Sequence, residues 1–186
     1  NRKFNGSISF LITGDEEGPA INGTTKVLDW MSKNNEVIDA CIVGEPTNPD
    51  YLGQMIKIGR RGSFTGWLTV TGVQGHTAYP HLAENPLSKL VKMLEPLAEE
   101  QLDKGTEYFP PTTAAISSID TGNSASNVIP QKVTASFNIR FNDSRTAEDI
   151  EKWLRAHFDS VGGNYTLETA CSSNAFITEP GALSDD

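Results

Sequence analysis

Cysteine and histidine are scarce in this sequence, with two of the former and three of the latter among 186 residues. Cys41 and Cys171 form no CxxC pair, so neither a disulfide framework nor a cysteine-rich zinc site is expected. Cys41 lies in an apolar run and is expected to be a buried free thiol. Free thiols favour a reducing compartment, which predicts a cytoplasmic protein.

Long apolar runs and basic clusters are also missing. No apolar stretch approaches the ~20 residues of a membrane-spanning helix, and no signal peptide opens the chain. Acidic residues outnumber basic ones by 24 to 15, and Arg60-Arg61 is the only pair of adjacent arginines. The net charge of −9 excludes nucleic acids and anionic membranes as expected partners. Because Asn1 leads directly into an apolar run, we expect a piece of a larger protein.

The first sixty residues follow a strand–helix–strand pattern. An apolar strand is expected at 7–13, an amphipathic helix at 24–33 and a second buried strand at 40–43. This order predicts a parallel sheet, in which ligand sites form beyond the carboxyl ends of the strands. The acidic stretches Gly14–Gly18 and Gly44–Thr47 directly follow the two predicted strands.

Residues 62–173 have a different pattern, typical of an antiparallel sheet with two helices. The expected elements are strands at 64–73, 113–119, 132–141 and 165–170, a helix from Asn85-Pro86 to about Lys104 that is kinked at Pro96, and a helix capped by Thr146. The order βαββαβ predicts a ferredoxin-like sandwich. We therefore predict an α/β protein with a partial α/β domain at 1–61, an inserted ferredoxin-like domain at 62–173, and a return into the first domain at 174–186.

Carboxylates gather where the first two predicted strands end. Glu16 and Glu17 follow the strand at 7–13, and Glu45 follows the strand at 40–43. A bound cation would relieve their mutual repulsion, and carboxylates are zinc ligands. A neighbouring glutamate outside the metal shell could take a proton from an activated water. A solvated acidic turn explains the same pattern, so charge alone leaves both interpretations open.

The three histidines are spaced unlike any zinc signature. His157 flanks the apolar face of the second helix of the inserted domain and is expected to be structural. His76 is expected to form hydrogen bonds rather than to ligate a metal. His81 follows Pro80 and is expected to pack against it.

Five motifs occur together and in order along the chain. They are Gly14-Asp-Glu-Glu-Gly18, Gly44-Glu-Pro-Thr47, Gly59-Arg-Arg-Gly-Ser63, Gly75-His-Thr-Ala-Tyr-Pro-His81 and Asn127-Val-Ile-Pro130. With these motifs, nearly the whole chain resembles the dinuclear zinc deacylases and peptidases that include acetylornithine deacetylase and carboxypeptidase G2. The third and fourth motifs resemble those of the succinyl-diaminopimelate desuccinylases within that family.

This resemblance implies roles for individual residues. Glu16 would be the general base, and Glu17 and Glu45 would each ligate one metal ion. Arg140 would bind a substrate carboxylate, for which a guanidinium is well shaped; an exposed strand arginine without a ligand is the alternative. The remaining substrate-contacting positions would be Arg60, Ser63 and Tyr79, together with His76 and Asn127, which would serve the active site of a partner subunit.

The resemblance also implies a reaction and its participants. The inserted domain would be a dimerisation or lid domain that forms a homodimer. The cofactors would be two Zn²⁺ ions, or Co²⁺ in their place. The reaction would be amide hydrolysis of N-succinyl-LL-2,6-diaminopimelate to succinate and LL-2,6-diaminopimelate, in lysine and diaminopimelate biosynthesis.

The chain departs from the family pattern in its metal ligands. It contains no His-x-Asp before the first predicted strand, no metal-bridging Asp and no His near its end. We therefore expect these 186 residues alone to be inactive. A related deacylase such as acetylornithine deacetylase, and a non-catalytic dimerisation or lid module, are the alternative functions.

Overall fold

The computed structural model describes residues 5–99, 101–181 and 183–184. The chain divides into two compact units, Asn1–Pro46 and Thr47–Asp186, which we call the N-terminal unit and the sheet unit. Within the described residues, no helix is both long enough and apolar enough to cross a membrane.

The N-terminal unit is built around helix α1, Thr24–Lys33. The described residues at 7–13 and 40–43 form no strand, contrary to the prediction, and Ile12 is 90% exposed. A strand needs a neighbour to bond its backbone and a layer to cover its side chains, and the described part of this unit supplies neither. For the same reason Cys41 is exposed, so the expectation of a buried thiol was wrong.

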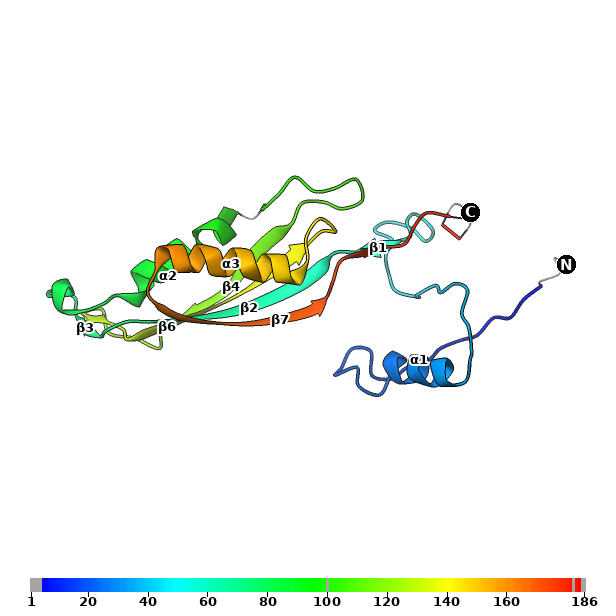
Figure 1. The fold of residues 1–186 in the computed structure, drawn as a ribbon, viewed down its shortest axis with the longest axis horizontal. Coiled ribbons are helices and arrows are strands. Elements are labelled where there is room, and N and C mark those ends of the chain that lie inside the picture. The colour runs from blue at the N-terminus through cyan, green and yellow to red at the C-terminus, as the bar shows by residue number, and fades with distance from the viewer. Residues whose placement is uncertain (1–4, 100, 182, 185–186) are drawn as a thin grey trace. The chain divides into compact units, whose positions relative to one another are not determined.

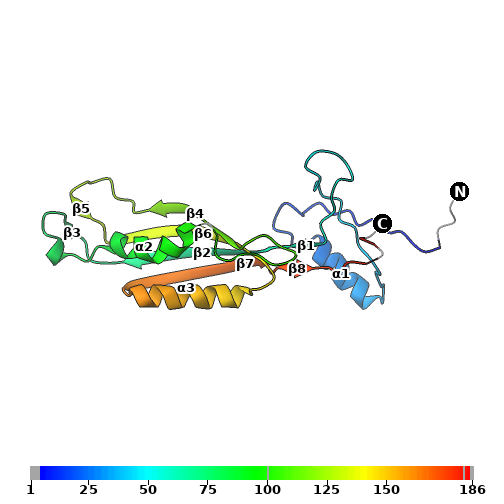
Figure 2. The same ribbon diagram turned by 90° about the horizontal axis from the view of Figure 1, so that it is seen from above.

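The sheet unit has the predicted βαββαβ order. Its main elements are β2 (Gly62–Thr71), α2 (Pro86–Leu94), β4 (Thr113–Asp120), β6 (Lys132–Phe141), α3 (Ala147–Val161) and β7 (Asn164–Ser173). The strands form one antiparallel sheet in the order β4-β6-β2-β7, with α2 and α3 running along it (Figures 1 and 2). The ferredoxin-like part of the predicted fold is therefore confirmed.

Two short ribbons extend this sheet unit. Strand β1 (Gly59–Arg60) pairs with β8 (Phe176–Ile177), where the chain enters and leaves the main sheet. Strand β3 (Gly75–His76) pairs with β5 (Val128–Ile129). Figure 1 shows the two ribbons at opposite ends of the sheet unit.

The core lies between the helices and one face of the sheet. Alternate residues of β6 are buried there: Val133, Ala135, Phe137, Ile139 and Phe141. The helices bury Leu90, Met93 and Leu94 from α2 and Ile150, Leu154 and Phe158 from α3. The opposite face of β6, from Thr134 to Arg140, is polar and partly exposed, which is the alternation expected of a sheet covered on one side.

The helix ends follow from local chemistry. The Thr146 hydroxyl accepts from the Asp149 N–H at 3.2 Å, and the Asp149 carboxylate accepts from the Thr146 N–H at 2.9 Å, so α3 begins with the predicted cap. Helix α2 ends at Leu94 and continues as the 3₁₀ helix η2, Glu95–Glu99. Pro96 breaks the helix as predicted, because proline lacks an N–H and clashes with the preceding turn. The expected extension to Lys104 was wrong, since Gln101 already bridges to Thr113.

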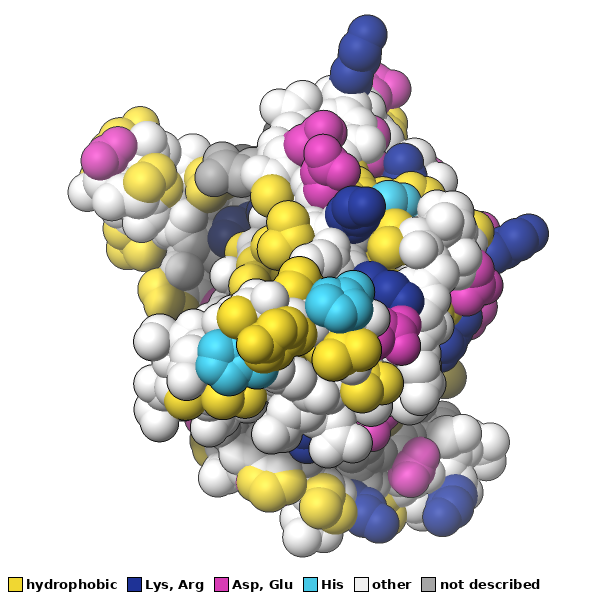
Figure 3. All heavy atoms as spheres, turned by 90° about the vertical axis from the view of Figure 1, so that its left-hand side faces the viewer, with side chains coloured by type: hydrophobic (Ala, Val, Ile, Leu, Met, Phe, Trp, Pro, Cys, Tyr) yellow, Lys and Arg dark blue, Asp and Glu magenta, His cyan; other side chains and the backbone are white. Residues whose placement is uncertain are grey.

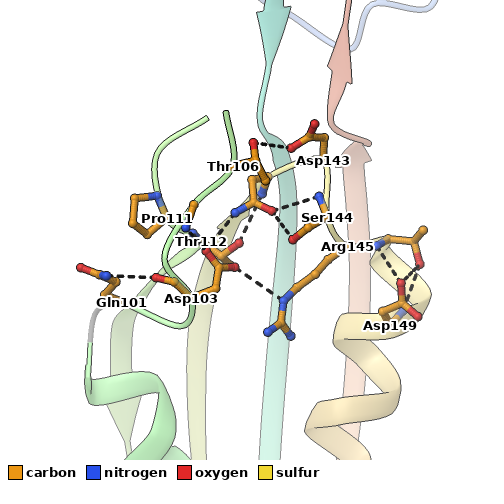
Figure 4. A network of polar contacts seen from close by, with 12 residues as sticks. Gln101, Asp103, Thr106, Pro111, Thr112, Asp143, Ser144, Arg145 and Asp149 are labelled. Carbon is orange, nitrogen blue, oxygen red and sulfur yellow. Dashed lines mark hydrogen bonds and ion pairs between the residues drawn. The ribbon is translucent and has the colours of Figure 1, made fainter. Parts of the chain in front are cut away.

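A buried polar network anchors the loop between η2 and β4 (Figure 4). The Asp103 Oδ1 atom accepts hydrogen bonds from Gly105 N, Thr112 N and Asn142 Nδ2, each 2.9 Å long. Arg145 Nε lies 3.6 Å from Asp103 Oδ2. Burial alone raises the pKa of Asp103, but the bonds from Thr112, Gly105 and Asn142 outweigh it and hold the pKa below its ordinary 3.8. The network ties this loop to the turn between β6 and α3.

Glycine at position 66 makes room for the core. A Cβ added to Gly66 would overlap the ring of Phe137, which is fully buried on the facing strand. We expect Gly66→Ala to lower the free energy of unfolding by about 1–3 kcal/mol, because the ring has no space to move into. Urea denaturation followed by circular dichroism measures the change. Gly181→Ala is the control, since nothing lies within 4 Å of its added Cβ, and an equal loss in both variants would contradict the prediction.

Candidate functional site

The predicted metal-site carboxylates lie in the N-terminal unit. Glu16 and Glu17 are exposed on a turn that is closed by Asp15, whose carboxylate accepts from Ile21 N at 2.9 Å and from Asn22 N at 3.3 Å. Glu45 is exposed in the segment that follows residues 40–43. Among the described residues, no three His, Cys, Asp or Glu side chains are placed to hold a metal ion. The described residues therefore do not by themselves make a complete metal site.

Arg60, Ser63 and Arg140 lie together at the β1 end of the sheet. Ser63 pairs with Arg140 across β2 and β6, and Arg60 stands three residues earlier in β1. Ser63 is buried, whereas both arginines are exposed. Within the described part of the chain, the side chains of Arg60 and Arg140 form no hydrogen bond or ion pair. Both cations are thus available to an anionic ligand.

Asn138 organises this end of the sheet by hydrogen bonds to β2, and no motif had marked it as a candidate. Its Nδ2 atom donates to Ser63 Oγ at 3.2 Å and to Thr65 Oγ1 at 3.0 Å. Because the Ser63 oxygen accepts this bond, its own hydrogen remains free to donate to a ligand. The polar alternation along β6 was the only sequence signal that could have pointed to Asn138.

His76, Tyr79 and Asn127 lie together at the opposite end, on and beside the β3–β5 ribbon. The Thr77 N–H donates to the Asn127 carbonyl at 3.0 Å, and the Tyr79 N–H donates to the His76 carbonyl at 2.9 Å. The His76 Nδ1 atom accepts from the Ala78 N–H at 3.0 Å. When the ring is neutral, its proton is therefore on Nε2, which makes His76 a hydrogen-bond donor to an external oxygen.

The surface around these residues is apolar for an exposed turn. Tyr79 is 57% exposed and Leu82 is 70% exposed, and the rings of His76 and His81 lie 5.9 and 6.4 Å from that of Tyr79. Figure 3 shows histidine side chains among hydrophobic ones at this end of the molecule. An apolar surface around a hydrogen-bond donor is typical of a contact surface for another protein.

The length of β2 separates the two groups of predicted substrate residues. Ser63 is the second residue of β2, and His76 comes five residues after its last residue, Thr71. The ten residues of β2 span about 30 Å. One copy of the sheet unit therefore cannot place Arg140 and His76 on the same small substrate.

The third histidine has the predicted structural role. The His157 Nε2 atom lies 3.0 Å from the Lys92 carbonyl oxygen, which ties α3 to α2. Its ring also contacts that of Phe158, with the centroids 6.0 Å apart.

Comparison with known proteins identifies the sheet unit. Residues 58–166 match the family model of the peptidase dimerisation domain. Over 180 residues the chain is 62% identical to a succinyl-diaminopimelate desuccinylase of Rhodospirillum centenum, covering 97% of this chain and 47% of that protein. It is 56% identical over 185 residues to a desuccinylase of Parvibaculum lavamentivorans, with the same two coverages. The chain thus spans about half the length of the curated relatives it matches.

Solved structures share the fold at much lower identity. A putative aminohydrolase from methicillin-resistant Staphylococcus aureus superposes with a TM-score of 0.54 at 23% identity, covering 67% of this chain and 34% of that one. An amidase of the hydantoinase/carbamoylase family from Burkholderia multivorans gives a TM-score of 0.55 at 18% identity, with coverages of 66% and 30%.

Proposed function

The chain belongs to the peptidase dimerisation domain family, and on that premise we propose that it is the central part of a metal-dependent succinyl-diaminopimelate desuccinylase. The resemblance to desuccinylases predicted from the five motifs is confirmed by the relatives. The observation that carries the proposal is 62% identity to a desuccinylase over 97% of this chain. The proposed reaction breaks the amide bond of N-succinyl-LL-2,6-diaminopimelate with water, giving succinate and LL-2,6-diaminopimelate.

In this proposal the N-terminal unit supplies the groups that act on water. Glu16 takes a proton from the attacking water and passes it to the departing amine, which is general base and then general acid catalysis. Glu17 and Glu45 each contribute one ligand to a pair of metal ions, and the other ligands come from residues outside this chain. The metal pair, Zn²⁺ or Co²⁺, supplies Lewis-acid activation of the carbonyl and the water.

The sheet unit supplies the groups that hold the substrate. Arg140 and Arg60 are unpaired cations within the described residues, which suits a substrate carrying carboxylates. The Ser63 hydroxyl is a further proposed contact at this end of the sheet, and the Tyr79 side chain, which lies beside His76, is a proposed contact to the substrate of a second copy. Because His76 lies at the far end of β2, it and Asn127 serve the active site of a second copy, where the Nε2–H of His76 donates to the oxyanion that develops on the scissile carbonyl.

The remaining parts of the proposal follow from the same assignment. Residues 1–61 and 174–186 belong to the catalytic domain, and 62–173 form the dimerisation and lid domain of a homodimer. Cys41 and Cys171 are free and exposed thiols, which fits a cytoplasmic enzyme of lysine and diaminopimelate biosynthesis.

The preference for a succinyl group over an acetyl group is tested with a protein extended to the length of the desuccinylase relatives. We expect kcat/KM for N-succinyl-LL-2,6-diaminopimelate to exceed that for N-acetylornithine by at least about 10²-fold, because N-acetylornithine lacks the succinyl carboxylate and the second amino-acid carboxylate and so leaves an arginine without its anion. Ninhydrin detection of the released amine measures both rates. Faster hydrolysis of N-acetylornithine would assign the protein to the related deacylases instead.

The 186 residues alone are expected to bind fewer than two zinc ions and to hydrolyse neither substrate. The reason is that the described residues hold no complete metal site. Isothermal titration with Zn²⁺ and the same amine assay test this. Two tightly bound ions together with desuccinylase activity would contradict it, whereas inactivity of the extended protein as well would favour a non-catalytic dimerisation or lid module.

A further inference from the structure

The β1–β8 ribbon is covered by one aromatic side chain from a distant loop. Phe109 is only 9% exposed. A Cβ added to Gly59 would lie 3.0 Å from Phe109 Cζ, 2.9 Å from Ile177 Cδ1 and 2.6 Å from the Phe176 carbonyl oxygen. The ring therefore lies close to the Gly59 backbone and the Ile177 side chain, leaving no room for a side chain at position 59.

The loop that carries Phe109 is fixed by its own hydrogen bonds. The Thr106 N–H donates to the Phe109 carbonyl at 2.9 Å, and the Phe109 N–H donates to Thr106 Oγ1 at 3.2 Å. Gly105 permits this tight turn with a φ of +81°, where side chains are rarely tolerated. Its N–H donates in turn to Asp103, which connects the loop to the buried network of Figure 4. The hydrogen bonds to Thr106 and Asp103 thus fix the position of the loop that carries Phe109.

The ribbon that Phe109 covers is short, and the residue after it, Arg61, donates from Nη1 to the Pro111 carbonyl at 3.2 Å and to Thr113 Oγ1 at 3.3 Å. Each of its strands has two residues, and it is extended by one bond from Thr178 N to the Ile58 carbonyl at 2.7 Å. Two paired residues are too few to be stable by themselves. Arg60 lies in this ribbon, one residue after the glycine that Phe109 contacts. The geometry of Arg60 therefore depends on what holds the ribbon in place.

We propose that Phe109 is a positioning residue: by packing on Gly59 and Ile177 it fixes the β1–β8 ribbon, and through the ribbon it fixes Arg60 relative to Ser63 and Arg140. This inference deepens the proposed function, because it states how the substrate-holding arginine is kept in place. Phe109 itself need not touch the substrate. The loop at 105–109 thus connects the hydrogen-bond network around Asp103 to the β1–β8 ribbon, where the chain enters and leaves the main sheet.

Amide hydrogen exchange tests whether Phe109 stabilises the ribbon, and it can be measured on the 186-residue chain without an enzyme assay. Phe109→Ala is expected to speed exchange of the Thr178 N–H by about tenfold or more, because the ribbon loses its cover. Exchange of the Ile139 N–H, in the centre of the main sheet, is expected to stay within about threefold. Phe109→Leu keeps an apolar side chain and is expected to retain most of the protection. Tyr108→Ala is the matched control, since Tyr108 is the adjacent aromatic residue and is exposed.

Kinetics of the extended protein test the positioning role. Phe109→Ala is expected to raise KM for the succinylated substrate by about tenfold with little change in kcat, because a contact made equally in ground and transition states is lost. Phe109→Leu should keep KM close to the wild-type value.

Unchanged Thr178 exchange, or an equal acceleration at Ile139, would overturn the proposal whatever the enzyme's activity. Faster Thr178 exchange with an unchanged KM would overturn the role of Arg60. An extended protein inactive even as wild type would refute the proposed function, while the exchange data would still decide whether Phe109 holds the ribbon.

Discussion

Mixing a His76→Ala subunit with a Glu16→Gln subunit is expected to restore hydrolysis that neither variant shows alone. In a Glu16→Gln homodimer both sites lack the base, which costs about 10²–10⁴-fold in kcat. In a His76→Ala homodimer both sites lack the proposed oxyanion donor, at a cost of about 10²–10³-fold. In the heterodimer, one site has an intact Glu16 in its own subunit and an intact His76 from the other.

The expected recovery follows from symmetry. Random pairing of equal amounts makes half of the dimers mixed, and each mixed dimer has one complete site of two, so activity should reach about a quarter of the wild-type value. The variants are unfolded together, refolded and assayed with the succinylated substrate. This uses the extended protein, whose activity is itself part of the proposal.

The control pairs two variants from the same unit. Glu16→Gln mixed with Glu45→Gln should remain inactive, because every site of the mixed dimer lacks one carboxylate or the other. If both mixtures recover equally, or if neither recovers while the wild-type protein refolds fully, His76 does not serve a partner's site. The prediction rests on the separation of Arg140 and His76 along β2, which one copy cannot bridge.

Replacing Asp103 by alanine is expected to be the most destabilising single change in the loop that carries Phe109. Its carboxylate satisfies the backbone N–H of Thr112 and the side-chain amide of Asn142, and both residues are fully buried. Unsatisfied buried donors cost about 1–3 kcal/mol each, so Asp103→Ala should lose about 2–5 kcal/mol. The melting temperature should fall by about 5–15 °C. Differential scanning calorimetry measures it.

The stabilisation by Asp103 should also depend on pH. Its pKa is lower in the folded chain than the ordinary 3.8, so the folded state prefers the ionised form. This contribution is complete above the unfolded pKa and is lost as the pH falls through the folded pKa. Wild type should therefore lose stability below about pH 4 more steeply than Asp103→Ala does.

Two further variants separate charge from hydrogen bonding. Asp103→Asn keeps an acceptor oxygen and should cost less than Asp103→Ala, yet it should share the shallower acid dependence. Asp143→Ala is the control, because the exposed Asp143 accepts only the hydroxyl of Thr106, at 2.7 Å, within the described residues. An acid dependence that is unchanged in Asp103→Ala would show that other carboxylates govern it.

The sheet unit could be predicted from the sequence because its signals are local. Alternation along 132–141, the Thr146 cap and the break at Pro96 each depend on a few neighbouring residues, and each is confirmed. The strands predicted at 7–13 and 40–43 depend instead on neighbours that the described residues do not include. The same apolar side chains that suggested buried strands, such as Phe10 and Ile42, are exposed in this chain.

The site could be predicted only as separate pieces. The motifs selected Ser63, His76 and Asn127, and the family resemblance selected Arg140, but their spacing could not show that β2 holds them apart in two groups. Asn138 and Phe109 escaped selection because each acts through a contact with a residue far away in sequence. Asn138 reaches Ser63 across the sheet, and Phe109 reaches Gly59 from a loop. The roles of Glu16, Glu17 and Glu45 stay predictions, as do those of the residues expected to contact the substrate.

The place of β2 at the centre of the sheet has a consequence for how the chain folds. Strand β2 is the first of the four main strands to be synthesised, yet its neighbours β6 and β7 are the last two. Ser63 pairs with Ser173, so one edge of β2 stays open until nearly all of the sheet unit has left the ribosome. Such distant pairing slows folding, because the entropy of closing a long loop is lost before the paired contacts form. Until β6 and β7 have been synthesised, both edges of β2 lack their partner strands and are open to pairing with another chain.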